Sequence, residues 1–316
     1  MSQEHHVKWR IVLPKVAAIP VLSVLIMFLL CHAIVIPSEY FTEAVAAVPS
    51  TLPDIALIVA IQFIIGTVLY TVIKYRKRRL AKLSFYLIIV SYIAGSLIIA
   101  FYTLYLLISP FIHFHLLLPL MLLFSTVLSI VLIYWFVSEC PIKKYLSALL
   151  SSLAAALNIV LYLPSSFSLL LIAVMPIVDV LLVYFGPLGK SIQEVRKRVE
   201  QFQTYEIHGQ EQIQVGRTLN PILRMTVRMD GIMLGIGDFL LYSLATMWST
   251  AVLISKFGPS LTVLFLMYLI YLPLFLLAFY INIRICLKRS YGPAATIPLV
   301  VALIFTLACY YFLSLK

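Results

Sequence analysis

Two aspartates lie inside long apolar runs of the sequence, where a charged side chain needs a reason. Asp179 lies in AVMPIVDVLLVYFGPL (173–188), and Asp238 lies in MLGIGDFLLYSL (233–244). The chain has twelve acidic residues, and the remaining ones fall in loops, tails or the mouths of predicted helices. A carboxylate in the hydrocarbon zone of a bilayer costs roughly 2.5–3.5 kcal/mol on insertion scales, so such residues mark candidate functional sites.

Two aspartates held close together can activate water. Carboxylates within hydrogen-bonding reach cannot both ionise cheaply, so the pair shares one proton. The ionised member takes a proton from water, while the protonated member polarises a peptide carbonyl. A pair of this kind could hydrolyse a peptide bond. Buried aspartates also bind Na⁺ or relay protons in transporters, and a lone aspartate can cap a broken helix end, so these alternatives stay open at this point.

The composition identifies the elements that must position the pair. The 316-residue chain is 63% hydrophobic and 11% charged, with a mean hydropathy of +1.08. A soluble domain of this length would lack the polar surface to cover such a core. We expect an all-α polytopic membrane protein with nine transmembrane helices, each long enough to cross a bilayer. The predicted helices lie near 16–36, 52–73, 83–109, 113–137, 145–163, 167–187, 231–254, 260–283 and 293–313.

The basic residues predict the topology. The net charge of +11 comes from Lys and Arg that gather in alternate connections, such as KYRKRRLAK (74–82) and the segment 189–229. By the positive-inside rule the N-terminus is cytoplasmic and nine crossings place the C-terminus outside. This distribution argues against nucleic-acid binding and indicates a multi-pass protein, expected in the cell membrane. The lipid bilayer is then an expected partner of the protein.

The whole chain, residues 1–316, reads as one membrane domain. We expect helices one to five (about 16–163) to form a scaffold and helices six to nine (about 167–313) to carry the site. The segment 189–229 is predicted to be a cytoplasmic loop. Within it, 190–202 has the pattern of an interfacial amphipathic helix, and ILRMTVRM (222–229) favours a short extended segment.

Antiparallel sixth and seventh helices would bring the aspartates to one depth. Each carboxylate lies roughly 10–15 Å from the cytoplasmic end of its predicted helix. Gly231, Gly235, Asp238 and Tyr242 are spaced to share one helical face, and the two glycines form a GxxxG pair that allows close helix approach. Gly237 removes side-chain bulk beside Asp238, and on the other helix Pro176 is expected to cause a kink near Asp179.

LGIGDFLLYSL (234–244) resembles the GxGD signature of the presenilin and signal peptide peptidase family of intramembrane aspartyl proteases. In that family the partner aspartate follows a tyrosine on the preceding helix. Asp179 is on the required helix, although Val178 replaces the tyrosine. A third family element, Pro-Ala-Leu at the start of the ninth helix, is matched by YGPAATIPLV (291–300), which has alanine in place of the leucine.

The resemblance implies a presenilin-like fold and hydrolysis of peptide bonds within transmembrane helices or signal-peptide remnants, with no metal or organic cofactor. It implies catalytic roles for Asp179 and Asp238. The expected supporting residues are Gly235, Gly237, Tyr242, Pro293, Ala294 and Ala295. The family picture also predicts that the interfacial helix acts as a gate and that 222–229 pairs with an unwound substrate by strand addition.

Other classes of protein remain as alternatives or are disfavoured by residues. The sequence has no HExxH motif for a zinc protease and no GxSG motif for a serine protease. A prepilin-peptidase-like GxGD protease leaves Pro293-Ala294 unexplained. The alternative from another class is a secondary transporter or channel that uses the two aspartates as a proton or cation site, which predicts paired broken helices.

Overall fold

The computed structural model is mostly helical. It describes residues 7–31, 78–109, 116–186, 226–229, 232–288 and 295–312, together with the single residues 53, 56, 60 and 67. Among these residues, seven helices are long and apolar enough to cross a membrane. The chain is therefore an integral membrane protein, as its composition predicted.

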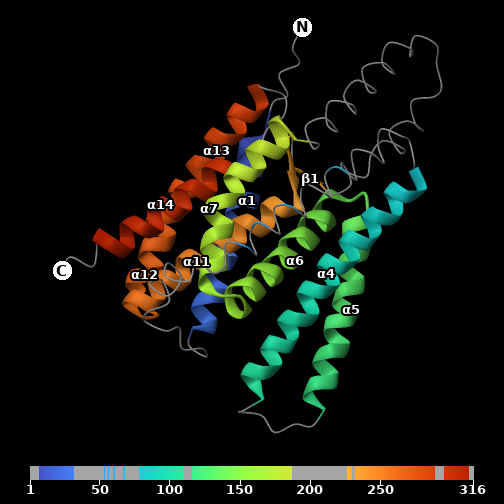
Figure 1. Cartoon of the computed structure of the whole chain (residues 1–316). Coiled ribbons are helices and arrows are strands. Elements are labelled where there is room, and N and C mark those ends of the chain that lie inside the picture. The colour runs from blue at the N-terminus through green and yellow to red at the C-terminus, as the bar shows by residue number, and fades with distance from the viewer. Residues whose placement is uncertain are drawn as a thin grey trace, which may run out of the picture.

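The first five of these helices, which precede the strands, are α1 (Trp9–Leu30), α4 (Arg78–Ile108), α5 (Leu117–Val137), α6 (Pro141–Tyr162) and α7 (Ser165–Tyr184) (Figure 1). The sixth is α11 (Ile236–Phe257). The seventh is a continuous run made of α12 (Leu261–Phe265), a π-helical segment η1 (Leu266–Tyr271) and α13 (Leu272–Lys288). A shorter apolar helix, α14 (Thr296–Phe312), ends the described chain.

Helices are present at eight of the nine predicted spans. The second predicted span, 52–73, lies mostly outside the described residues, although its four described positions are helical. The first helix begins at Trp9, before the predicted start, and continues through Pro14 and Lys15. The interfacial helix predicted at 190–202 lies outside the described residues.

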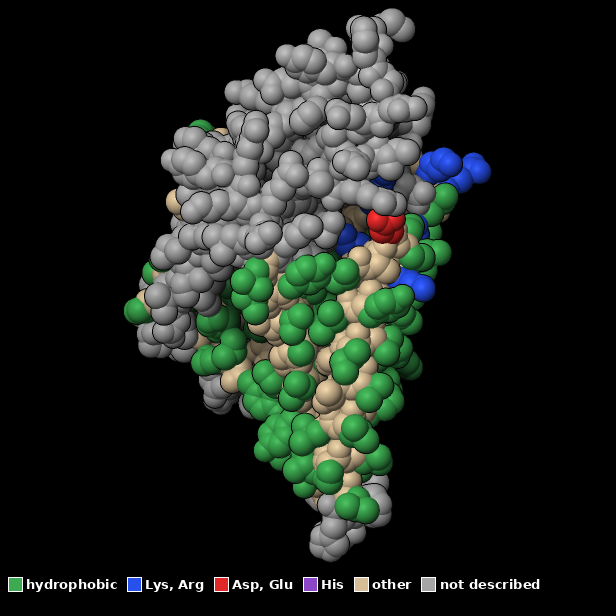
Figure 2. Space-filling model, turned by 90° about the vertical axis from the view of Figure 1, so that its right-hand side faces the viewer, with side chains coloured by type: hydrophobic (Ala, Val, Ile, Leu, Met, Phe, Trp, Pro, Cys, Tyr) green, Lys and Arg blue, Asp and Glu red, His purple; other side chains and the backbone are tan. Residues whose placement is uncertain are grey.

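Hydrophobic side chains cover the helices on the face in Figure 2, and the Lys, Arg and acidic side chains on that face gather at one end. The exposed side chains of α5 illustrate the pattern, since Leu123 is 62%, Phe124 57% and Ile130 63% exposed. Large apolar side chains in such positions would be a liability in water, whereas lipid solvates them.

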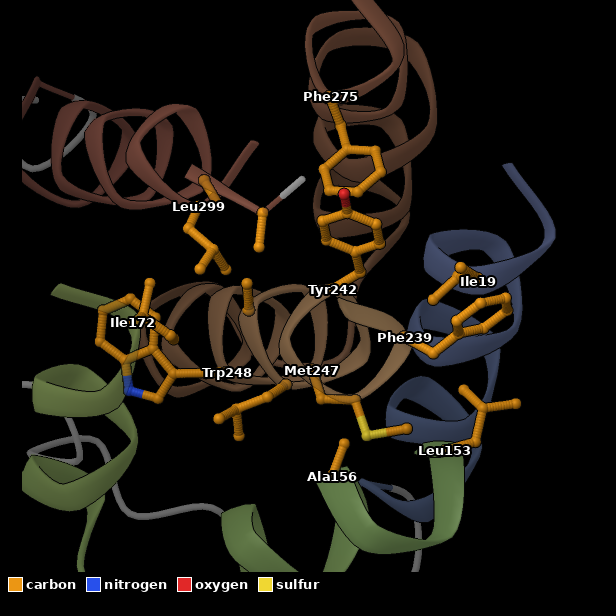
Figure 3. Close-up of a cluster of buried hydrophobic side chains, with 14 of the residues drawn as sticks. Ile19, Leu153, Ala156, Ile172, Phe239, Tyr242, Met247, Trp248, Phe275 and Leu299 are labelled. Carbon is orange, nitrogen blue, oxygen red and sulfur yellow. The ribbon is translucent and has the colours of Figure 1, made fainter. Parts of the chain in front are cut away.

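Helix α11 lies at the centre of the bundle and contacts α1, α6, α7 and α14. Its large side chains point outward into these neighbours: Trp248 lies beside Ile172 of α7, and Met247 points toward Ala156 of α6 (Figure 3). Trp248 and Met247 are fully buried. The site residues near the start of α11 are therefore held by helices on several sides.

Small hydroxyl side chains connect α11 to its neighbours. The hydroxyl groups of Thr246 and of Tyr271 in η1 lie 3.0 Å apart, and Thr306 of α14 donates to Ser249 at 2.7 Å. Thr246 and Thr306 also hydrogen-bond carbonyls of their own helices. Such bonds suit a membrane interior, because hydroxyl groups there have no water to replace a lost partner.

We predict that Thr306→Val destabilises the bundle more than Thr126→Val. Both threonine hydroxyls lie within hydrogen-bond distance of a carbonyl of their own helix, but only that of Thr306 also bonds a side chain of another helix. Loss of that bond should lower the unfolding free energy by about 0.6–1.7 kcal/mol, the range of interhelical bonds in membranes. Unfolding titrations in mixed micelles would measure the difference, and equal values for the two variants would contradict it.

Candidate active site

Asp238 lies in the first turn of α11. The helix begins at Ile236, directly after the strand β2 (Ile232–Gly235), and Gly235 caps it with an extended backbone (φ −71°, ψ 153°). The backbone N–H of Gly235 donates to Oδ2 of Asp238 at 2.8 Å. The carboxylate thereby satisfies one of the N–H groups that the start of a helix leaves without an intrahelical partner, and the helix dipole favours its negative charge there.

This arrangement corrects the prediction of one helix over 231–254. The residues before Ile236 form a strand, because Ile232–Gly235 pairs with β1 (Thr226–Met229) in an antiparallel hairpin. Gly235 therefore does not share a helical face with Asp238, and the predicted helical GxxxG pair is wrong. Gly231, its other member, lies outside the described residues. The extended segment predicted at 222–229 is confirmed for Thr226–Met229.

Although Asp238 is close to a helix end, it is still deep in the bundle. Ser152 of α6 donates to the carbonyl oxygen of Ile236 at 3.4 Å. Ser152 lies eleven residues after the first residue of α6, Pro141, which corresponds to roughly 16 Å along that helix. The hairpin of β1 and β2 lies between the level where α6 begins and the level of Asp238, where the sequence predicted part of a helix.

The hairpin has one buried and one outward face. Val227, Leu234, Met229 and Ile232 are at most 5% exposed, and β1 packs against α6. Met233 points outward and is 52% exposed. Non-helical backbone is tolerated at membrane depth only when its polar groups are paired and enclosed by protein. Strand pairing and the contact with α6 meet that requirement here.

Asp179 lies near the end of α7, three residues after Pro176 within that helix. The backbone N–H of Ala295 hydrogen-bonds the Asp179 carboxylate, and Ala295 directly precedes α14. The second carboxylate oxygen, Oδ2, is inaccessible to solvent and has no hydrogen-bond partner among the described residues. Each aspartate thus accepts a backbone N–H at the start of a helix and keeps further capacity to bind something else.

The structure brings the two aspartates together. Their carboxyl groups interact electrostatically, and the hydroxyl group of Tyr242 interacts with both. Tyr242 is fully buried and its ring meets that of Phe275 edge to face at 5.2 Å, which fixes its position in the core (Figure 3). Asp179, Asp238 and Tyr242 form a single polar site, with Ala295 at its border.

The other predicted site residues that the structure describes lie in different environments. Gly237 is exposed, and a methyl group added there would meet no atom within 4 Å, whereas one added at Gly235 would lie 3.3 Å from Oδ2 of Asp238. Ala295 is fully buried and contacts Asp179 through its N–H. Pro293 and Ala294 lie outside the described residues.

Two features were missed in the sequence. The hairpin had a signal: Asp230-Gly231 stands between two runs of alternating residues, and Asp-Gly is typical of two-residue hairpin turns. The hydrogen bond from Ala295 to Asp179 had no signal in the sequence, because it joins residues 116 positions apart through a backbone N–H. Within the described ranges, no three His, Cys, Asp or Glu side chains come together, so the aspartates stand as a pair.

No protein-family model matches the chain, and none of the curated proteins is detectably similar to it in sequence.

We predict opposite stability effects for alanine at the two glycines. Gly237→Ala should preserve or raise the unfolding free energy, by up to about 1 kcal/mol, because alanine is the better helix former and the space is open. Gly235→Ala should lower it by about 0.5–1 kcal/mol, because alanine is a poor N-cap and its methyl group crowds Asp238. Thermal unfolding in detergent would measure both, and the reverse order would contradict this description of the strand-to-helix junction.

Proposed function

We propose that this chain is an intramembrane aspartyl endopeptidase that hydrolyses peptide bonds within transmembrane helices or signal-peptide remnants. The convergence of Asp179 and Asp238 carries the proposal. They are 59 positions apart in the sequence, come from different helices, and interact at membrane depth. Two acids that share a proton supply both the base and the acid needed to hydrolyse an amide.

In the proposed mechanism, the ionised aspartate takes a proton from a water molecule held between the two carboxyl groups. The other aspartate, in its protonated form, donates a hydrogen bond to the scissile carbonyl and stabilises the oxygen as negative charge develops. The N–H groups of Gly235 and Ala295 keep the carboxylates oriented throughout. Tyr242 offers a further hydroxyl beside both acids.

A helical substrate must unwind first, because its scissile bond is hidden within hydrogen-bonded turns. The strand β2 leads directly into the site and offers a template for the unwound form. The N–H of Gly235 bonds Asp238 and is not used by the partner strand β1. Because N–H directions alternate along a strand, that of Met233 also points away from β1. We therefore assign Met233 as the pairing position for an unwound substrate strand.

The proposed topology has nine crossings, with the N-terminus in the cytoplasm and the C-terminus outside, in a cell membrane. It rests on the positive-inside distribution of Lys and Arg. The preferred substrates are then single helices whose N-termini lie outside. This orientation resembles that of presenilins and is opposite to that of signal peptide peptidases.

The test of the dyad uses the purified full chain in liposomes with a panel of single-helix fusion substrates. Asp179→Asn and Asp238→Asn should each lower cleavage by about 10²–10⁴-fold, because each removes one proton-transfer group. Glu139→Gln, which changes an acid outside the membrane-spanning helices, should cleave at the wild-type rate. Mass spectrometry of the products locates the cut.

A wild-type rate in either asparagine variant would remove that aspartate from the mechanism. If the wild-type chain cleaves none of the substrates, and cation flux into the same liposomes is lost in both variants, the pair is a transport site instead.

The strand template is tested by two proline substitutions in one cross-strand pair, Arg228↔Met233. Met233→Pro removes the N–H that faces away from β1, so cleavage should fall at least about tenfold, the equivalent of about 1.4 kcal/mol. Arg228→Pro removes an N–H on the opposite edge of the hairpin and should cleave normally. The thermal stability of each variant is measured beside its cleavage rate, so that a loss of folding is recognised. A loss of cleavage confined to Arg228→Pro would place the substrate on β1.

A further inference from the structure

A cavity lies away from the aspartates, between α1, α4 and α6. Its volume is about 360 Å³, and α6 contacts both of the other helices. Every lining residue is aliphatic or aromatic; the lining includes Leu29 and Leu30 of α1, Ala100 and Leu104 of α4, and Leu153 and Leu157 of α6. No residue of α7, α11 or α14 lines it, so it is separate from the proposed catalytic site.

The cavity lies along the second halves of three helices that have their N-termini at the same end. It spans Ile26–Leu30 of α1, Leu97–Leu104 of α4 and Leu150–Leu157 of α6. The segment of α6 alone extends roughly 10 Å along the helix axis. By the predicted topology this is the half of the bilayer nearer the outside.

Hydrogen bonds made by side chains of α4 and α6 hold one wall of the cavity in place. Tyr92 of α4 bonds Ser152 of α6 at 3.0 Å, and Asn158 of α6 donates to the carbonyl of Ser96 at 2.9 Å. Thr103 of α4 donates to the hydroxyl of Tyr162 on α6 at 2.6 Å. These bonds occur at successive levels, so the spacing of α4 and α6 is set by polar contacts and does not depend on filling the cavity.

The rim of the cavity is polar where its walls are apolar. Tyr162 lies about one turn beyond the lining residue Leu157 of α6, its hydroxyl accepts a hydrogen bond from Thr103 of α4, and Tyr102 stacks on Tyr105 nearby on α4. Tyr162 is 47% exposed. Tyrosines with a buried ring and an accessible hydroxyl are typical of the headgroup level of a bilayer.

We propose that this cavity binds one acyl chain of a membrane phospholipid, whose ester and headgroup region lies against the exposed hydroxyl-bearing side chain of Tyr162. The cavity is open to the outside of the bundle, and water is a poor occupant because the lining offers it no polar partner. The volume is more than twice the ~150 Å³ of a cavity known to hold benzene. The surrounding solvent at this depth is hydrocarbon, and the combination of apolar walls and hydroxyl rim matches an amphiphile.

The test compares tryptophan at two adjacent positions of α4. Ala100 lines the cavity, whereas the side chain of Ile99 is 46% exposed on the outside of the helix. Each full-length variant is reconstituted in phosphatidylcholine, extracted, washed in detergent and weighed by native mass spectrometry. Wild type and Ile99→Trp should retain one phospholipid per chain, and Ala100→Trp should retain at least tenfold less. Added phosphatidylcholine should raise the melting temperature of the first two only, because a ligand stabilises the state that binds it.

Equal retention by Ala100→Trp, or none by wild type, would overturn the proposal. If Ala100→Trp does not fold, a second measurement on the wild-type chain still tests the proposal. A phosphatidylcholine with a photoactivatable group in its acyl chain should label α1, α4 and α6 at the lining residues above the level of labelling on α5. Uniform labelling, or displacement of the label by a single-helix peptide, would reject the lipid. Asp238→Asn should retain the phospholipid like wild type, so this result is independent of the proposed protease activity.

Discussion

A carboxylate at membrane depth must find its partners within the protein, because hydrocarbon offers neither water nor counter-ions. Both aspartates meet this requirement in the same way, by accepting a backbone N–H at the start of a helix. Asp238 accepts the N–H of Gly235, which caps α11, and Asp179 accepts the N–H of Ala295, which precedes α14. Helix starts are where N–H groups lack intrahelical partners. Two helices therefore begin inside the bundle beside the aspartates, and the site depends on those interrupted starts.

An interrupted helix creates a second requirement, since the chain before it still lies at membrane depth. The hairpin meets this requirement by pairing β2 with β1 and burying one face against α6. A strand pair in this place also leaves backbone groups of Met233 facing away from β1. The element that makes a helix start possible beside Asp238 is thus the one that can hold an extended peptide there.

Helix α11 links these parts because it is the helix that other helices enclose. Its hydroxyl side chains bond η1 and α14, and Tyr242 connects the aspartates to the aromatic core around Phe275. The α4–α6 side of the bundle is organised differently. Hydrogen bonds set the distance between these two helices, and apolar side chains line the space left beside α1. The two aspartates and this apolar cavity therefore lie on different helices of the bundle.

The sequence by itself determined the class of protein, the approximate positions of eight helices and the two aspartates that meet, because hydropathy and isolated charges are properties of single residues and short windows. It also indicated a short extended segment before Asp238. Only the tertiary structure decided where α11 begins, and that Ala295 bonds Asp179. Window-based hydropathy cannot separate a buried apolar strand from a helix, since both are enclosed by apolar side chains. What stabilises the break are hydrogen bonds and contacts with α6 and α14, and those partners lie far away in the sequence.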